Sequence, residues 1–363
     1  MKRASVFCLI RLQASKSDFI KFSVYLLPGR NGGDVKTKTR SITIVLSFFL
    51  LSLSCALGQN QVSERTAAND SEAMYRAASD LYEQGKFEEA IRTLKNVTTL
   101  RPDWALAYNG LCVCYTRTGH PNRAIKACER ALGLEPNFVS AHFNLGVIYD
   151  RQGRDTEAAE AFKRALALQP DHIQARYSLA GVYADLGLTD AAVDEYHRVN
   201  REHPTYRDAY MGLAALYVKL SVFKDAAEAL QTAIKLSPSE VPARTNLGLV
   251  YIAQRKFHEA IDVLNEAINI DGTVATAHHL LGYAYLSLGK KKRASQEFES
   301  AVRLRSQNAE SRYFLGLTSV SLGRRDEAIE QFRELETLDP VLARKLYQII
   351  YQDKLIDAAQ AKP

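Results

Sequence analysis

The chain has 363 residues, a formal charge of +6, and 47% hydrophobic and 24% charged residues. This composition is ordinary for a soluble protein, so disorder is not the default expectation. Residues 1–40 carry nine Lys and Arg against two Asp, so subtracting this surplus of seven leaves −1 for residues 41–363. A nucleic-acid binder carries its basic surface on its folded part, and the charge balance therefore disfavours that class.

Residues 1–34 are a basic arm in which no repeat or packing pattern is visible. The stretch that follows them resembles an export signal, and an export signal normally stands at the start of a chain. One hypothesis is that translation begins at Val35, because bacterial genes can start at a valine codon that is read as methionine. Residues 1–34 would then not be translated.

Residues 35–58 have the layout of a secretory signal peptide. Their head is basic, the run 41–53 is apolar without a charge, and small residues stand before Gln59. We therefore expect an exported protein, periplasmic or secreted, that is cleaved ahead of Gln59. Retention of residues 41–57 as a membrane anchor, or a lipid at Cys55, stays an alternative. The polar residues that follow, 59–70, are expected to be a linker.

A pattern with a period of thirty-four residues fills the chain from 71 to 342. Unit position 20 is Ala in all eight units, position 7 is Leu in seven, and positions 11 and 32 are Tyr and Pro in six. Eight matches in the same phase do not arise by chance. The units begin at Ser71, Ala105, Val139, Ile173, Arg207, Val241, Ala275 and Ala309.

Each unit is predicted to be a pair of helices. Positions 4, 7, 8 and 11 place apolar residues on one face of a first helix, and positions 17, 20, 24 and 27 do so on a second. Position 15 is usually Gly, which can adopt the left-handed conformation that ends a helix, and Pro at position 32 stops the second helix. Positions 8 and 20 are small, which predicts that the helices approach closely there. One pair cannot bury its apolar face alone, so consecutive units must stack.

The unit within residues 141–170 shows the pattern nearly whole, as Leu145, Gly146, Tyr149, Gly153, Ala158, Phe162, Ala165 and Pro170. This order resembles the tetratricopeptide repeat family, and the resemblance covers about residues 71–342. It implies an all-α, right-handed superhelical solenoid of eight units whose first helices line a concave side. Residues 343–363 are then a C-terminal capping helix and tail, with an apolar stripe formed by Leu342, Leu346 and Ile349.

The resemblance places unit positions 2, 5, 9 and 12 on the concave face, which is rich here in aromatic and aliphatic residues. An exposed apolar surface usually marks a partner site, so we predict a groove for an extended peptide or an amphipathic helix. The alternatives are that these side chains pack on one another, that the array self-associates as a structural component, or that it is a non-catalytic accessory subunit. The candidate groove residues are Tyr75, Tyr82, Phe143, Val147, Tyr177, Met211, Leu249, Ile252, His279, Tyr283, Tyr313 and Leu317.

No enzyme activity is expected, because the repeats occupy residues 71–342 and the sequence has no nucleophile, metal or phosphate-loop motif. We therefore predict no catalytic, cofactor-binding or metal site. The family's clamp for a terminal carboxylate needs Lys at position 5, and no unit has it. The predicted partner is a protein or peptide and not a nucleic acid, and membrane contact is expected only through the N-terminal segment.

Three residue groups receive a structural interpretation. Cys112 and Cys128 stand at positions 8 and 24 of one unit, where two buried free thiols are favoured over a disulfide. His278 stands at packing position 4, which favours a structural role. The run Lys290–Arg293 follows the turn Gly, where a charge run is usually solvated.

Overall fold

The computed structural model describes residues 9–13, 21–25 and 69–351, and the chain divides into two compact units, 1–76 and 77–363. In the first unit, β1 (Leu9–Gln13) and β2 (Lys21–Tyr25) form an antiparallel pair with Leu9 opposite Tyr25. Neither strand was predicted. The signal-like stretch 35–58 lies outside the described residues, and of the predicted linker only residues 69 and 70 lie inside them, where they are already helical.

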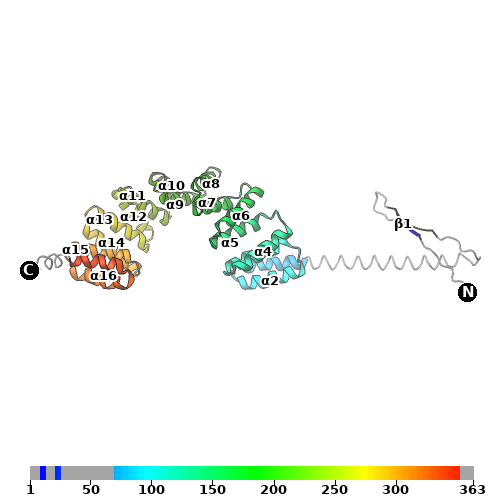
Figure 1. Cartoon of the computed structure of the whole chain (residues 1–363), viewed down its shortest axis with the longest axis horizontal. Coiled ribbons are helices and arrows are strands. Elements are labelled where there is room, and N and C mark those ends of the chain that lie inside the picture. Colours follow the sequence, from blue (N-terminus) through cyan, green and yellow to red (C-terminus); the bar gives the residue numbers. More distant parts are fainter. Residues whose placement is uncertain (1–8, 14–20, 26–68, 352–363) are drawn as a thin grey trace, which may run out of the picture. The chain divides into compact units, whose positions relative to one another are not determined.

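The remaining described residues form helices. A helical segment over 69–83 comes first, and the helices that follow are drawn in chain order in Figure 1. They are α2 (Phe87–Leu100), α3 (Ala105–Arg117), α4 (Pro121–Leu134), α5 (Val139–Arg151), α6 (Asp155–Leu168), α7 (Ile173–Asp185), α8 (Thr189–Glu202), α9 (Arg207–Lys219), α10 (Phe223–Leu236), α11 (Val241–Ala253), α12 (Phe257–Ile270), α13 (Ala275–Ser287), α14 (Lys291–Leu304), α15 (Ala309–Ser321), α16 (Arg325–Leu338) and α17 (Pro340–Ile350).

These helices confirm the predicted all-α solenoid of paired helices. Each first helix from α3 to α15 begins at the predicted first residue of its unit. Every helix from α2 to α17 packs against the next one, and several first helices also contact the first helix of the following unit, as α11 does with α13. Each unit therefore buries its apolar face against its neighbours, as stacked repeats must.

The close approach of the two helices within a unit depends on small residues. All eight Ala residues at position 20 are completely buried. At position 8 the small residue faces a large one at position 24: a Cβ added to Gly146 would lie 2.5 Å from the Phe162 ring, and one added to Gly248 would lie 2.5 Å from Leu264. A larger residue at position 8 would have to push the helices apart.

Unit position 4 corrects the predicted apolar face, because five of the eight units carry Arg or His there. Four of these side chains reach the backbone carbonyl of the residue six positions earlier, in the loop that joins two units; the pairs are His142 with Pro136, Arg176 with Pro170, His278 with Gly272, and Arg312 with Ser306. Three of them also contact a polar side chain of their own second helix, namely Glu195, Glu297 and Gln331. These contacts satisfy loop carbonyls that no helix bonds.

Helix α17 closes the C-terminal end of the stack, as predicted for a capping helix. It starts at Pro340, earlier than expected, because the Asp339 carboxylate accepts hydrogen bonds from the backbone N–H groups of Val341 and Leu342. Its buried residues are Ala343, Leu346 and Ile350. Of the predicted stripe, Leu346 is buried and Leu342 and Ile349 are half-buried, whereas the buried Ile350 was not part of the prediction.

Candidate partner-binding surface

The candidate groove residues all lie on first helices, and most of them are only partly accessible. Ten of the twelve are half-buried, whereas Leu249 is 41% exposed and Tyr283 is 38% exposed. Tyr75 and Tyr82 lie in the helical segment 69–83, and the others lie on α5, α7, α9, α11, α13 and α15. Most of these side chains therefore expose only a small part of their surface, and Leu249 and Tyr283 expose the most.

Packing against the next unit explains why the position-5 aromatics are half-buried. The Tyr177 ring lies 5.9 Å from that of Tyr196 in its own second helix and 5.7 Å from that of Tyr206, at the end of the loop to the next unit. Phe143 makes the equivalent contacts with Phe162 and His172. Each ring is held on two sides, which fixes its orientation before a partner arrives.

The largest aromatic group lies where the units of α13 and α15 meet. The Phe314 ring is stacked on Phe298 at 5.3 Å and lies 5.8 Å from both His279 and Tyr283. Burial lowers the pKa of His279 below its ordinary value, so the imidazole is neutral near pH 7, and its Nδ1 lies 2.9 Å from the Ser311 hydroxyl. Phe314 was missed in the sequence, because it stands at position 6 and not at a predicted groove position.

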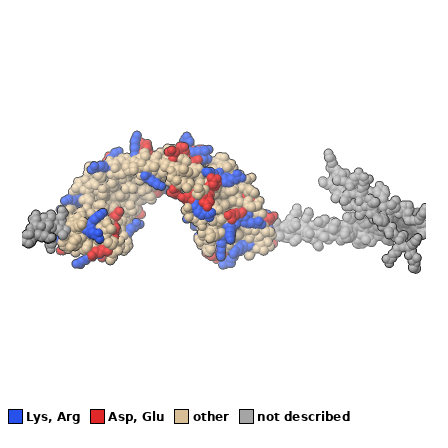
Figure 2. Space-filling view, viewed as in Figure 1, with Lys and Arg blue, Asp and Glu red and all other residues tan. Residues whose placement is uncertain are grey.

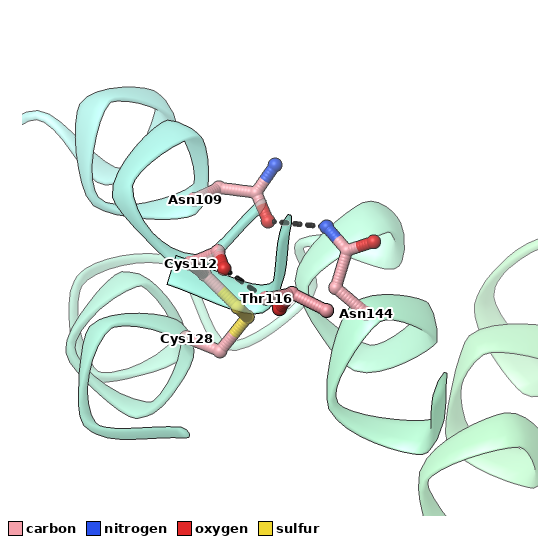
Figure 3. Close-up of a disulfide and its surroundings, with 5 residues drawn as sticks. All are labelled: Asn109, Cys112, Thr116, Cys128 and Asn144. Atoms are coloured by element: carbon pink, nitrogen blue, oxygen red, sulfur yellow. Dashed lines mark hydrogen bonds between the residues drawn. A yellow bond between two sulfur atoms is a disulfide. The ribbon is translucent and has the colours of Figure 1, made fainter. Parts of the chain in front are cut away.

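A polar pair joins two neighbouring units near the other end of the surface. The Asn144 side-chain amide donates a hydrogen bond of 2.9 Å to the Asn109 carbonyl oxygen, which Figure 3 shows between α3 and α5. The pair leaves the amide nitrogen of Asn109 and the carbonyl oxygen of Asn144 for further hydrogen bonds. Asn109 is buried, at 9% exposure, and Asn144 is half-buried, so Asn144 is the more accessible of the two. Sequence reasoning did not select either residue.

The structure corrects the interpretation of Cys112 and Cys128, which form a disulfide between α3 and α4 with a Cα–Cα distance of 5.3 Å (Figure 3). They occupy positions 8 and 24, which also face each other across the two helices in the units of Gly146, Gly248 and Gly282, so the pair fits a disulfide without any change of backbone. Cys114 is a buried free thiol whose pKa is raised by burial to about 11, and it is therefore protonated and unreactive at neutral pH.

The described residues contain no group of three His, Cys, Asp or Glu side chains that could hold a metal ion. A cleft of about 410 Å³ lies between α14, α15 and α16 and is lined by side chains that already pair with one another, such as Arg312 with Gln331. On the face shown in Figure 2, charges of both signs are scattered among uncharged atoms. No helix in the described part of the chain has the length and apolarity that a membrane crossing requires.

Structural comparison finds many repeat proteins of the same fold. A tetratricopeptide repeat protein from Parabacteroides merdae shares 20% identity with a TM-score of 0.52, covering 68% of this chain and 98% of its own. The C-terminal part of a repeat protein from Cytophaga hutchinsonii shares 16% identity with a TM-score of 0.55, covering 66% and 99%. PilF of Pseudomonas aeruginosa shares 19% with a TM-score of 0.51, covering 58% and 96%. At these identities the likeness shows the fold alone.

Sequence comparison gives the family. The model described as "Cilia and flagella-associated protein 70 C-terminal domain", a model of tetratricopeptide repeats, matches residues 136–339, which is more than half of the chain. A tetratricopeptide repeat model matches residues 81–145. A comparison with curated proteins gave no match. The chain therefore belongs to the tetratricopeptide repeat family, whose repeats are protein–protein interaction scaffolds.

Proposed function

We propose that the protein is an exported scaffold that binds a peptide or helix of a partner protein along its first-helix face. The observation that carries this proposal is the exposure of Leu249 and Tyr283, two large apolar side chains at position 9 of adjacent units. Large exposed apolar side chains in a row are costly to leave in water and are typical of partner sites. Binding there is passive, and no chemical step is part of it.

Two further features suit an extended peptide. The residues at position 9 are small in the middle of the array, at Gly181 and Ala215, so an extended chain could approach the helices closely there. Toward the C-terminal end they are large and apolar, and a peptide could place apolar side chains against them; they are Leu249, Tyr283 and Leu317. The half-buried Asn144, held in place by its hydrogen bond to Asn109, supplies a polar contact for the peptide backbone near the N-terminal end. Rigid aromatic anchors with few polar contacts are the usual source of binding energy at such surfaces.

Site-specific crosslinking tests the position of the partner. A photoreactive phenylalanine analogue in place of Tyr283 should crosslink a partner protein in the native cell extract, whereas the same analogue in place of Ile270 should not. Ile270 is a suitable control because it is 44% exposed, close to the 38% of Tyr283, but lies at the end of the second helix α12. Crosslinking at Tyr283 only to a second copy of the protein would instead favour self-association.

Export is proposed on two grounds. The sequence of residues 35–58 predicts a signal peptide, and the Cys112–Cys128 disulfide needs an oxidising compartment such as the periplasm or the exterior of a bacterial cell. Mass spectrometry of the protein from its native host tests this directly. We expect a chain that begins at Gln59 and, after denaturation, has one alkylatable thiol, Cys114. A chain that keeps residues 35–58, or one with three reactive thiols, would contradict it.

A further inference from the structure

Helix α14 begins with positively charged residues, which a helix N-terminus disfavours. Lys290 is its N-cap, and its first turn is formed by Lys291, Lys292 and Arg293, all exposed. Cations are unfavourable near the positive end of the helix dipole, and adjacent like charges repel one another. Six of the other second helices, α2, α6, α8, α10, α12 and α16, place Asp or Glu in this turn. The sequence predicted these cations in the turn, but three of them belong to the helix.

The three lysines at this helix start are not neutralised by an ion pair. Among the described residues, Lys290, Lys291 and Lys292 form no ion pair within 4 Å. The next turn continues the run with Arg324 and Arg325, and it is a spatial neighbour because Arg324 lines the same cleft as Ser295 of α14. We call these six residues, Lys290–Arg293 with Arg324 and Arg325, the basic edge. Within it Arg324 pairs with Glu327 at 3.5 Å, and the guanidinium groups of Arg293 and Arg325 lie over the rings of Tyr285 and Tyr351.

Apolar side chains occupy the same edge in two earlier units. Leu186 and Leu188 flank the turn before α8, and Leu220 and Val222 flank the turn before α10, each 37–50% exposed. They stand at unit positions 14 and 16, so they emerge on the side of the stack from which Lys290 and Arg324 emerge at position 16. One side of the solenoid thus carries exposed aliphatic groups followed by a cluster of flexible cations.

We propose that this side of the solenoid, the basic edge with the apolar turns beside it, binds the surface of an anionic lipid bilayer. Lys and Arg near such a surface are attracted to acidic headgroups, and aliphatic side chains can enter the boundary between headgroups and acyl chains. A nucleic acid would use the cations but would gain nothing from Leu188 and Val222, and exposed aromatic rings for stacking are not part of the edge. A bilayer would bind both the apolar turns and the basic edge. It would also explain why a run of cations that destabilises the start of α14 is present.

Vesicle binding of the full chain tests this proposal. The K292D/R293E variant gives the turn the acidic pair that Asp326 and Glu327 provide in the next unit. It should lower partitioning to phosphatidylglycerol-containing vesicles about 30-fold, since each of the two cations near the surface contributes about a factor of five. Its thermal stability should rise, because the acids now suit the helix N-terminus. A variant that lost binding because it misfolded would instead melt at a lower temperature than the wild type.

A matched control changes the total charge equally elsewhere. Lys126 and Arg164 are exposed within α4 and α6 and form no ion pair within 4 Å among the described residues, so K126E/R164E should bind vesicles as the wild type does. L188S/V222S should weaken vesicle binding several-fold without changing the binding of a single-stranded oligonucleotide. Equal binding of K292D/R293E and K126E/R164E would overturn the proposal, as would tighter binding of the oligonucleotide than of the vesicles.

Discussion

At the scale of single residues, the turn within each unit depends on one left-handed backbone position. Six units use Gly there, with φ between +67° and +77°, whereas Ser221 and Arg255 adopt φ of +61° and +60° without being Gly. The phase of the repeat and the contacts on both sides hold these two residues in a conformation that a Cβ disfavours. Their departure from the pattern therefore has an energetic cost but does not change the turn.

Ser221→Gly and Arg255→Gly should each stabilise the protein by about 0.5–1 kcal/mol, because Gly adopts the left-handed conformation without steric cost. Gly153→Ala, the reverse change in an intact turn, should destabilise it by about 1 kcal/mol. Urea denaturation followed by circular dichroism measures all three. A lower midpoint for Ser221→Gly would show that its turn is not strained.

His279 gives the fold a specific sensitivity to acid. Burial lowers the pKa of His279 in the folded state, while a nearby Glu310 carboxylate opposes this shift only in part. Above the unfolded pKa of about 6.5 the imidazole is neutral in both states and the fold keeps its full stability. As the pH falls below that value the unfolded chain takes up the proton first, and stability is lost.

His279→Gln should therefore flatten the loss of stability between pH values of about 6.5 and 5. The control is His258→Gln, which changes an exposed His at the start of α12. Denaturant unfolding of both variants across this range gives the comparison. An identical pH dependence for His279→Gln and the wild type would mean that the buried imidazole does not set the acid response.

At the scale of the element, the Cys112–Cys128 disulfide takes the place of the side-chain contact that other units make between positions 8 and 24. Positions 8 and 24 hold Gly against Leu in the unit of α11 and α12, but two Cys in the unit of α3 and α4. We therefore expect the α3–α4 hairpin to be the part of the stack most affected by reducing conditions.

Reduction should destabilise the wild type by about 3 kcal/mol, the usual contribution of a disulfide that closes a loop of about 15 residues. The C112G/C128L variant recreates the Gly248–Leu264 pair and should be insensitive to reductant. Thermal melts with and without dithiothreitol measure the difference. A wild type that melts at the same temperature in both would show that the bond is absent or contributes nothing.

The period of the sequence is sufficient to predict the helices but not all of their contacts. Each first helix starts where the pattern places it, because the spacing of Leu, Ala and Gly defines the apolar faces and turns. The Arg and His side chains at position 4 were assigned to an apolar face, since periodicity does not show that a loop carbonyl needs a donor. The disulfide depends on the redox state of the compartment, which a single sequence does not state.

The predicted surface residues show the same division. That Phe143 and Tyr177 lie on first helices follows from the repeat, but their burial depends on His172 and Tyr206 at the end of the following loop. Those contacts exist only when two units are stacked at a particular distance. The exposure of Leu249 and Tyr283, like the Asn109–Asn144 pair, could therefore be found only in the structure.

At the scale of the whole molecule, the solenoid separates two kinds of surface. The first helices carry anchored aromatic and aliphatic side chains, and the turns carry the apolar residues and the basic edge. The two surfaces use different residues, because Tyr283 lies within α13 whereas Lys290 lies beyond its end. We propose that the first-helix face holds the partner.

The affinity of a peptide selected on the wild-type chain from a random display library tests that claim most directly. L249A/Y283A should weaken its binding at least about tenfold, as loss of central anchors does. L100A/I270A removes side chains of comparable exposure, 51% and 44%, from second helices, and it should change the affinity less than about twofold. Equal affinities for the wild type and L249A/Y283A, or equal losses in both variants, would contradict a partner site on the first-helix face.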